Sequence, residues 1–474
     1  MMNLSVLNTD ELTAIHQATQ RILAETGIIL THEGARKLFM EAGAQTKGER
    51  VYLPSNLVEW ALSQCPSKVS IKGREGKTVV LGDGTLHWHN VGGARDVYDP
   101  PTRQVHPATI KDVIDSARVL DALDNVTAVV PFFTPQDVPG EIMSLAMYRH
   151  TLPYTTKPIH GPGVQTRREV QIAVQMTEVI GSPSELLTLG ISPVSPLVFP
   201  NDVVDAMMET AKTGIALSPL PCPTAGTTAP MSIAGAIAQQ NAEILASIVL
   251  AEIVKPGLPI VYTGRLAMME PRTGLSVWGG VELALASAAT VQLGHYYGLP
   301  VNVYGFSTNS QELNLQNGYE RALNAAIPAL AGADELSGVG EMQAGIAGSF
   351  AQMVCDNEIA GSVGRLRRGF SVDDDALGVE VIASVMGSTH NFLGQRHTRK
   401  YLRAGEVFFT KLAVRDPWAE WERKNRDGMA EHAQAEAERI LADHHAPPLN
   451  KEQDKELDKI LQAAIKELVN NGIE

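Results

Sequence analysis

The stretch 215–262 constrains the fold more than any other part of the chain, because a strand, a loop, a helix and a second strand follow one another there. The first strand is apolar, and the loop after it consists of small residues. We expect a helix from Pro230 to about Val254, capped by Thr227 or Thr228, since helix starts favour proline and a side-chain oxygen. The stretch therefore predicts one βα unit of a parallel sheet.

Similar units recur from residue 125 onward with a period of about thirty to forty residues, which is typical of βα repeats. The predicted strand ends are at residues 129–133, 157–160, 187–192, 218–222, 260–263, 301–306, 334–338 and 353–355. Eight such units close a TIM (β/α)8 barrel. A doubly wound open sheet is the alternative, but no GxGxxG motif follows the first strand, and the regular spacing favours closure.

Residues 1–120 have a different pattern. Three short helices are expected first, and the period of the apolar residues then switches to two, as in β-hairpins. One hairpin is predicted to turn at residues 82–84 and another at residues 99–102. In the first hairpin, His87 and His89 share one face. We therefore predict that residues 1–120 form a cap that is separate from the βα repeats.

We predict helices in the last part of the chain, and these helices need another protein surface to pack against. A long charged helix is expected from Asp416 to about His444, and Asn450 is expected to cap a final helix with one apolar face. The covered surface is either the barrel exterior or a second subunit. Because these helices could pack between two subunits, we expect a homo-oligomer. The sequence thus predicts three parts: an N-terminal helical and β-hairpin cap at 1–120, the barrel at 121–415 and a C-terminal helical extension at 416–474.

Charge and composition exclude several classes of protein. The net charge of −14 and the pI near 5.4 argue against a nucleic-acid partner, which requires a basic face. Three cysteines lie far apart without a CxxC motif, so neither a disulfide framework nor a structural zinc site is predicted, and a reducing compartment is expected. The sequence shows no signal-peptide pattern, and its most apolar helix contains Gln239, Gln240 and Glu243. We expect no membrane span and a cytoplasmic location.

Aromatic residues at the predicted strand ends indicate a binding site at the barrel mouth. Aromatic residues are scarce, yet several fall at these ends: Phe132, Phe133, Tyr262, Tyr304 and Phe306. Rings around a mouth suit a quaternary ammonium ion, which has no hydrogen-bond donor and is held by π-faces and carboxylates. Each ring taken alone is also typical of a hydrophobic core.

Polar residues near the same ends complete the candidate site. His160 follows a predicted strand, where a barrel would aim it into the mouth; alternatively it only bonds a loop carbonyl. Arg265 and Arg272 suit a ligand carboxylate, or else they are solvated loop charges. Glu341, near the seventh strand end, either faces the mouth or caps a helix.

The motif His87-Trp88-His89 suggests a metal site as a competing interpretation. An HxH motif at the end of a barrel strand places two imidazoles on one face, as metal-dependent hydrolases use. The motif lies before the repeats, however, and no recognisable set of companion ligands follows it. We therefore expect no metal, and an exposed or hydrogen-bonded hairpin face is the simpler interpretation.

Several motifs, specific in their sum, resemble the trimethylamine methyltransferase family. They are PTAGTTAPMSIAGAIAQQNAE at 223–243, the stretch 264–282, GYERA at 318–322, GVGEMQAG at 338–345, MVCDNEI at 353–359 and the hairpin GGARDVYDPPT at 92–102. The resemblance covers most of residues 1–415. It implies a TIM barrel that moves a methyl group from an amine to the Co(I) centre of a separate corrinoid protein.

One departure concerns pyrrolysine, which the trimethylamine enzymes of this family carry in the barrel mouth. This sequence shows only standard residues, so it is similar to the non-pyrrolysine branch, whose members demethylate quaternary amines such as glycine betaine. The resemblance therefore implies transfer of a methyl group from glycine betaine to the Co(I) corrinoid (cobalamin) of a cognate protein, with release of dimethylglycine. No tightly bound cofactor is expected on the chain itself.

Each candidate residue has an expected role in that implied function. The cage around the cation is expected to consist of Phe132, Phe133, Tyr262 and Tyr304. His160 and Arg265 would bind the carboxylate, and Glu341 would also contact the substrate. No catalytic residue is assigned, because a quaternary nitrogen leaves as a neutral amine and requires no general acid.

Three alternatives stay open. Another quaternary amine, such as proline betaine or carnitine, would need the same residue types. A metal-dependent barrel hydrolase would use His87, His89 and His160. A betaine-binding or sensing barrel would bind the ligand but would never methylate Co(I) cobalamin.

Overall fold

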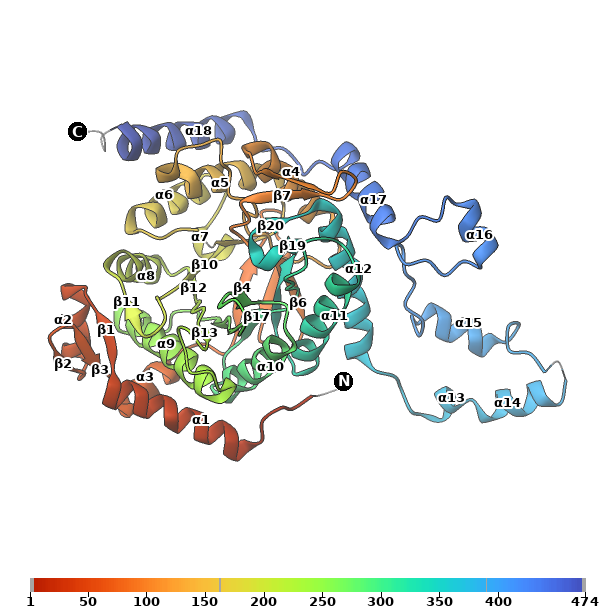
Figure 1. Ribbon diagram of the computed structural model, residues 1–474, viewed down its shortest axis with the longest axis horizontal. Coiled ribbons are helices and arrows are strands. Elements are labelled where there is room, and N and C mark those ends of the chain that lie inside the picture. Colours follow the sequence, from red (N-terminus) through yellow and green to blue (C-terminus); the bar gives the residue numbers. More distant parts are fainter. Residues whose placement is uncertain (1–3, 162, 389, 471–474) are drawn as a thin grey trace.

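A ring of parallel strands forms the centre of the computed structural model, which describes residues 4–161, 163–388 and 390–470 (Figure 1). Its named strands are β6 (His87–Asn90), β9 (Ile159–Gly161), β10 (Leu187–Ile191), β12 (Ala216–Pro219), β14 (Tyr262–Gly264), β17 (Val301–Tyr304) and β18 (Glu335–Val339). Isolated parallel bridges place the segment 128–129 between β6 and β9 and join β12 to β14. Since β18 pairs with β6, the pairing returns to its start. The chain is a TIM (β/α)8 barrel, as predicted.

Helices alternate with these strands and cover the outside of the ring. They are α4 (Ile110–Ala122), α5 (Met143–Thr151), α6 (Arg167–Glu178), α8 (Asn201–Thr213), α9 (Ile233–Val254), α10 (Val281–Tyr296), α11 (Leu315–Leu330) and α12 (Phe350–Arg368), with a short α7 (Pro183–Leu186) before β10. The predicted βα unit around α9 is present, but the helix begins at Ile233 with Ser232 as its N-cap, not at Pro230. Thr228 is not the cap, because its hydroxyl accepts a hydrogen bond from the Thr224 amide inside the loop, at 2.8 Å.

Helix α9 is a core helix of the barrel. Among the described residues it is the one helix long and apolar enough to cross a membrane, and 83% of its most apolar window is buried inside the protein. A helix that is apolar on all sides and covered by protein belongs to the core of a large domain. The burial of α9 therefore accounts for its composition.

Two strand predictions are wrong. The segment 353–355 lies inside α12, and the missing strand of the ring is β6. β6 was expected to form a hairpin turning at 82–84, but β5 (Thr78–Leu81) pairs with β4 (Val69–Lys72) instead. All four residues of β6 are buried, as a central parallel strand requires. The barrel thus takes a strand from the segment that was predicted as a cap, and the division into three domains stays a prediction.

The hairpin β4–β5 closes the N-terminal end of the ring. Its apolar side chains cluster with residues at the starts of β12 and β14: Val69, Ile71, Val79, Leu81, Ala216 and Val261. This end of the barrel is filled by a core, so a ligand can enter only from the C-terminal ends of the strands.

The loops at the C-terminal ends carry two small sheets. One consists of β13 (Thr224–Ala225), β15 (Ala267–Met269) and β16 (Ser276–Val277). The other consists of β7 (Asp96–Asp99), β8 (Gln104–Pro107), β19 (Glu341–Met342) and β20 (Ala347–Gly348). The antiparallel pairing of β7 with β8 confirms the hairpin predicted at 99–102.

The three predicted N-terminal helices are confirmed as α1 (Thr9–Arg21), α2 (Glu33–Glu41) and α3 (Ser55–Gln64). Helices α1 and α3 pack against α9 and cover its outer side. A small sheet beside them contains β1 (Ile28–Leu30), β2 (Gln45–Lys47), β3 (Arg50–Tyr52) and β11 (Val198–Phe199).

The C-terminal part contains α13 (Asp374–Leu377), α14 (Val379–Met386), α15 (Arg396–Arg403), α16 (Trp418–Arg423), α17 (Met429–Asp443) and α18 (Lys451–Ile465). Figure 1 shows α13, α14 and α15 projecting from the barrel. The single long helix predicted up to His444 is wrong: Asn425 and Arg426 have φ of +61°, and this left-handed backbone separates α16 from α17. The Asn450 cap of α18 is confirmed, because its side chain accepts from the Gln453 amide at 2.8 Å.

Candidate functional site at the barrel mouth

A cavity of about 320 Å³ opens among the C-terminal ends of the barrel strands, where this fold places its chemistry. Side chains from many strands line it, among them His89, His160, Thr188, Arg265, Asn302, Tyr304 and Glu335. A larger groove of about 960 Å³ lies between α12 and α17 on the outside of the barrel. That groove is away from the strand ends, so the smaller cavity is the candidate site.

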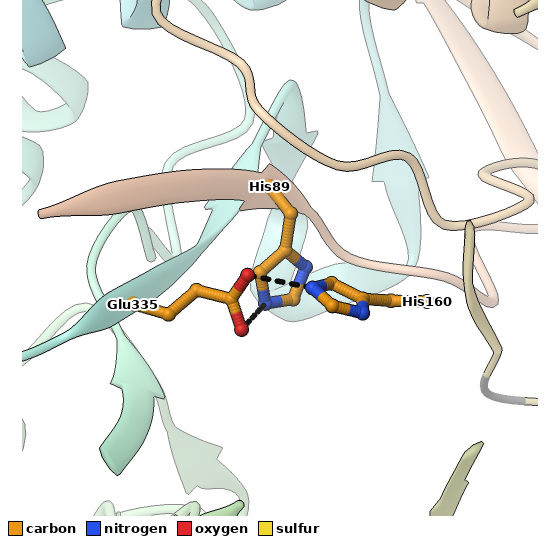
Figure 2. Close-up of side chains that lie close together, drawn as sticks. All are labelled: His89, His160 and Glu335. Atoms are coloured by element: carbon orange, nitrogen blue, oxygen red, sulfur yellow. Dashed lines mark hydrogen bonds and ion pairs between the residues drawn. The ribbon is translucent and has the colours of Figure 1, made fainter. Parts of the chain in front are cut away.

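Glu335, at the start of β18, is the centre of a polar cluster in this cavity (Figure 2). Its side chain is buried, with Oε1 at 2.6 Å from His160 Nε2 and Oε2 at 3.8 Å from His89 Nε2. Asn302 Nδ2 donates to Oε2 at 2.5 Å. These contacts connect β6, β9, β17 and β18, so the cluster is fixed by the ring of strands itself.

Arg265 is tied to the same cluster through Asn302. Arg265 Nη2 donates to Asn302 Oδ1 at 2.5 Å, and Nη1 donates to the backbone oxygens of Asn302 and Gly264, both at 3.1 Å. A guanidinium group has five N–H donors, and these bonds use three of them. The remaining donors of a fixed Arg265 are available to a ligand in the cavity.

Burial and neighbouring charges set the ionisation of these groups. Burial alone would raise the pKa of Glu335, but His160 and His89 beside it outweigh burial and hold this pKa well below its ordinary value. Burial lowers the pKa of His89 to about 4, so its imidazole is neutral at pH 7. Burial also lowers the pKa of Arg265, whose guanidinium nevertheless stays charged at neutral pH. The cavity therefore holds one carboxylate and one guanidinium.

Two aromatic rings form another side of the cavity. Trp278 and Tyr304 both line it, with ring centroids 5.4 Å apart, and Arg265 Cζ lies 4.9 Å from the centroid of Tyr304. Glu341 is fully buried behind Tyr304 and accepts from the Ser307 hydroxyl at 2.9 Å. Burial raises the pKa of Glu341 to about 7, although Arg321 acts in the opposite direction. Glu341 therefore titrates near neutral pH.

The structure brings only some of the predicted site residues to this cavity. His160, Arg265 and Tyr304 line it, whereas Glu341 lies behind Tyr304. The lining does not include three of the predicted cage residues, Phe132, Phe133 and Tyr262. The four-ring cage expected from the sequence therefore does not form here.

The alternation of side chains along a strand explains the misplaced rings. Thr263 lines the cavity, so the preceding Tyr262 faces outward, where its hydroxyl donates to Asn241 Oδ1 of α9 at 2.7 Å. Phe132 and Phe133 are buried and pack edge to face, with centroids 4.6 Å apart.

Phe306, which also stood at a predicted strand end, is buried as well. Its ring stacks on Trp88, with the two centroids 4.8 Å apart. These four rings contribute to packing.

Two further predictions about charged residues are corrected. The metal set considered from the sequence combined His87, His89 and His160, but the side chains that converge are His89, His160 and Glu335. Both ring nitrogens of His87 are buried without a hydrogen-bond partner among the described residues. Arg272 is not at the cavity, because its side chain is 86% exposed and pairs with Glu270 at 2.7 Å.

Sequence reasoning missed several residues of the cavity: Thr188, Trp278, Asn302 and Glu335. Asn302 could have been predicted from the sequence, because it lies two residues before Tyr304 on one strand and therefore shares its face. Glu335 and Ser337 share a face for the same reason. Trp278 lies in a loop, where no periodic sequence pattern indicates the direction of a side chain.

Comparisons with known proteins agree on one family. The model of the trimethylamine methyltransferase (MTTB) family matches residues 1–467. Trimethylamine methyltransferase MttB of Desulfitobacterium hafniense (strain DSM 10664 / DCB-2) is 30% identical over 455 residues, which cover 94% of this chain and 91% of that protein. The glycine betaine methyltransferase of Desulfitobacterium hafniense (strain Y51) is 30% identical over 470 residues, which cover 97% of this chain and 96% of that protein.

Solved structures agree on the fold. The Methanosarcina barkeri monomethylamine methyltransferase MtmB is similar with a TM-score of 0.50 and 13% identity, over 91% of this chain and 92% of that chain. A hydroxylamine complex of MtmB gives a TM-score of 0.51 and 13% identity over 92% of each chain. At this identity the likeness concerns the fold alone.

Proposed function

Because the chain belongs to the trimethylamine methyltransferase family, we propose that it moves a methyl group from glycine betaine to the Co(I) corrinoid of a partner protein and releases dimethylglycine. Family membership supports the reaction class. One observation carries the choice of a zwitterionic quaternary amine: a buried guanidinium and aromatic rings line the same small cavity. The residues are Arg265, Trp278 and Tyr304.

The chemistry of a quaternary amine suits a chain of standard residues. The nitrogen is already cationic and has no lone pair. When a methyl group leaves, the nitrogen keeps the electron pair of the broken C–N bond and becomes a neutral tertiary amine, so no proton moves. The partner's corrinoid supplies the electron pair for the new bond to the methyl carbon. The residues of the cavity therefore need only to bind, orient and exclude water.

Arg265 is the residue that we assign to the substrate carboxylate. Its guanidinium is fixed by Asn302 and Gly264 and keeps donors for a ligand. A charged pair with a carboxylate is strongest in such a buried, oriented group. The carboxylate and the ammonium of glycine betaine are separated by one methylene group, so the groups that bind them must adjoin. Arg265 and Tyr304 do adjoin, at 4.9 Å.

Trp278 and Tyr304 are the residues that we assign to the trimethylammonium group. Each aromatic face contributes about 0.5–2 kcal/mol to the binding of a desolvated cation. Arg265 covers one face of Tyr304, so the substrate cation is expected between Trp278 and the free side of Tyr304. Because β4–β5 closes the opposite end of the barrel, the methyl group is presented through the C-terminal mouth.

The proposal also covers the location and the oligomeric state of the enzyme. We propose that it acts in the cytoplasm, which is supported by three cysteines that are all free thiols. We also propose a homo-oligomer, supported by the apolar side chains exposed on the projecting helices of Figure 1. Proline betaine and carnitine carry the same two groups as glycine betaine and are the alternative substrates.

The test is a panel of amines with the purified protein and cobalamin reduced to Co(I), followed by loss of the Co(I) absorbance. Glycine betaine is expected to react. Choline, which lacks the carboxylate, is expected to react at least about 100-fold more slowly. Reaction of trimethylamine alone would contradict the proposed substrate, and binding of glycine betaine without any loss of Co(I) would indicate a sensor. Reaction of carnitine or proline betaine alone would reassign the substrate within the class.

A further inference from the structure

Three side chains of the cavity lining, from β6, β9 and β18, converge, and Figure 2 shows how close together they lie. We propose that His89, His160 and Glu335 bind a divalent metal ion of the zinc class, with one coordination position open toward the cavity. Two imidazoles and one carboxylate are a common ligand set for such ions. The sequence predicted no metal, so this site is a departure from that expectation, and it does not depend on the proposed function.

The spacing of the ligand atoms suits a tetrahedral site. With metal–ligand bonds of about 2.0–2.1 Å, neighbouring ligand atoms lie about 3.3 Å apart. Glu335 Oε1 is 2.6 Å from His160 Nε2, and Oε2 is 3.8 Å from His89 Nε2. All ligand atoms lie within 4.8 Å of one another. Because the two distances involve different carboxylate oxygens, side-chain shifts are needed to bring one oxygen and both Nε2 atoms to the tetrahedral spacing.

Each imidazole is also held by its other ring nitrogen, as metal-binding histidines are. His89 Nδ1 lies 2.6 Å from the backbone oxygen of Asn90. That oxygen can only accept, so Nδ1 carries the proton and Nε2 carries the lone pair. His160 Nδ1 contacts the Thr188 hydroxyl, which turns its Nε2 toward Glu335. Both Nε2 atoms are therefore oriented for a common ligand.

The same atoms also take part in a hydrogen-bonded network. Asn302 Nδ2 lies 2.7 Å from His89 Nε2 and 2.5 Å from Glu335 Oε2. A metal would replace the Asn302 amide at His89 and the proton between His160 and Glu335. Asn302 is therefore a competitor of the metal and not a ligand. Its removal distinguishes a metal site from a structural network.

The charge of the site indicates the class of ligand at the open position. Glu335 is the one anionic ligand of the three, and Arg265 adds a positive charge on the cavity side. A divalent ion would leave an excess of positive charge, which an oxygen anion would balance. We expect a carboxylate there. If the proposed function holds, on which this step rests, that carboxylate belongs to glycine betaine.

The test loads the full-length protein with Zn²⁺ after chelator treatment and counts the bound ions by elemental analysis. Co²⁺ is used in parallel, because a tetrahedral Co²⁺ site has a characteristic visible spectrum. About one ion per chain is expected. Glu335→Gln is expected to weaken binding by more than about 100-fold and Thr188→Val by about 10–100-fold. Asn302→Ala is expected to retain the ion, and His106→Ala, on the exposed strand β8, is the matched control.

Substoichiometric metal in the wild type, or equal binding by the wild type and Glu335→Gln, would mean an adventitious ion only and would overturn the site. Thermal unfolding of each metal-free variant checks that it is folded, and Thr188→Val tests the same claim without removing a ligand. Glycine betaine is expected to shift the Co²⁺ spectrum, and an unchanged spectrum would overturn the carboxylate step.

The amine panel is run on the same samples to separate the two proposals. Transfer from glycine betaine by protein that binds no metal would reject the site and leave the proposed function in place. Stoichiometric binding without transfer from any amine would reject the function and leave the site.

Discussion

The barrel cavity and the outer segment of the chain depart from the usual distribution of side chains in opposite ways. In the cavity, charged groups are buried, with Glu335 1% exposed and Arg265 6% exposed. In the outer segment, which we define as residues 370–388 and 390–409, apolar side chains are exposed, up to 78% for Phe370 and 82% for Leu393. Figure 1 shows that this segment projects from the barrel.

The two regions are suited to ligands of different sizes. Buried charges are costly unless they are hydrogen-bonded, and those of the cavity are held by several strands, which suits a small, oriented ligand. Exposed apolar patches mark surfaces for larger partners. We therefore expect changes in the cavity to alter chemistry without altering assembly, and changes in the outer segment to do the reverse.

The largest effect is expected from Arg265→Ala. The variant loses the charged group assigned to the carboxylate, so kcat/KM for glycine betaine is expected to fall by about 10³–10⁴-fold. The slow reaction with choline should change little. Arg272→Ala, which removes an exposed arginine of a nearby loop, is the control. An equal loss with both substrates would show that Arg265 acts only on the structure.

The next effect concerns the stability contributed by Glu341. Burial raises its pKa from 4.5 to about 7, so the folded protein binds this proton more tightly than the unfolded chain. The contribution to the free energy of unfolding is therefore fully present below about pH 4.5 and is lost as pH rises to about 7. It amounts to at most about 3 kcal/mol.

Urea unfolding of the wild type and Glu341→Gln at pH 5 and pH 8 measures this contribution. The decrease with pH is expected to be smaller in the variant. It is not abolished, because burial also raises the pKa of Asp356 to about 6. Identical decreases in the two proteins would contradict the assignment.

Asn302→Ala is expected to have a smaller effect on turnover. Arg265 loses the side chain that orients its Nη2, so kcat/KM for glycine betaine is expected to fall by about 10–100-fold, mainly through a higher KM. Steady-state kinetics separate the two constants. A fall in kcat alone would show that Asn302 does not act through substrate binding.

Trp278→Leu tests the aromatic side of the cavity. Loss of one π-face costs about 0.5–2 kcal/mol of cation binding, which corresponds to a KM about 2–30-fold higher. Tyr262→Leu, which also removes one aromatic ring, is the matched control, because Tyr262 faces α9 and not the cavity. If the control raised KM as much as Trp278→Leu, the cage predicted from the sequence would regain support.

The smallest effect on activity is expected in the outer segment. Replacing Phe370 and Leu393 with serine should shift the protein toward the monomer in sedimentation experiments, since both side chains are exposed and apolar. Methyl transfer to free cobalamin should stay within about twofold, because surface changes away from a site have little effect. An unchanged assembly would mean that this surface is not an interface between subunits.

Much of the barrel could be predicted because each βα unit repeats the same local pattern. The strand β6 could not, because its four residues follow turn signals that also fit a hairpin, and only its pairing with β18 shows its place. The cavity was harder still. Asn302 and Glu335 are partners on the neighbouring strands β17 and β18, but His89 and His160 reach Glu335 only when the ring closes, and no spacing in the sequence encodes that contact. Tyr262 shows a second limit of sequence-based prediction. Neighbouring residues on a strand face opposite sides, so an error of one residue moves a side chain out of the barrel.

A single-turnover experiment with glycine betaine and cobalamin reduced to Co(I) tests the proposed methyl transfer. We expect one dimethylglycine to be released for each Co(I) consumed, and the release to be about 10³–10⁴-fold slower with Arg265→Ala. Loss of Co(I) without dimethylglycine, or release of dimethylglycine at the same rate by the wild type and Arg265→Ala, would contradict it.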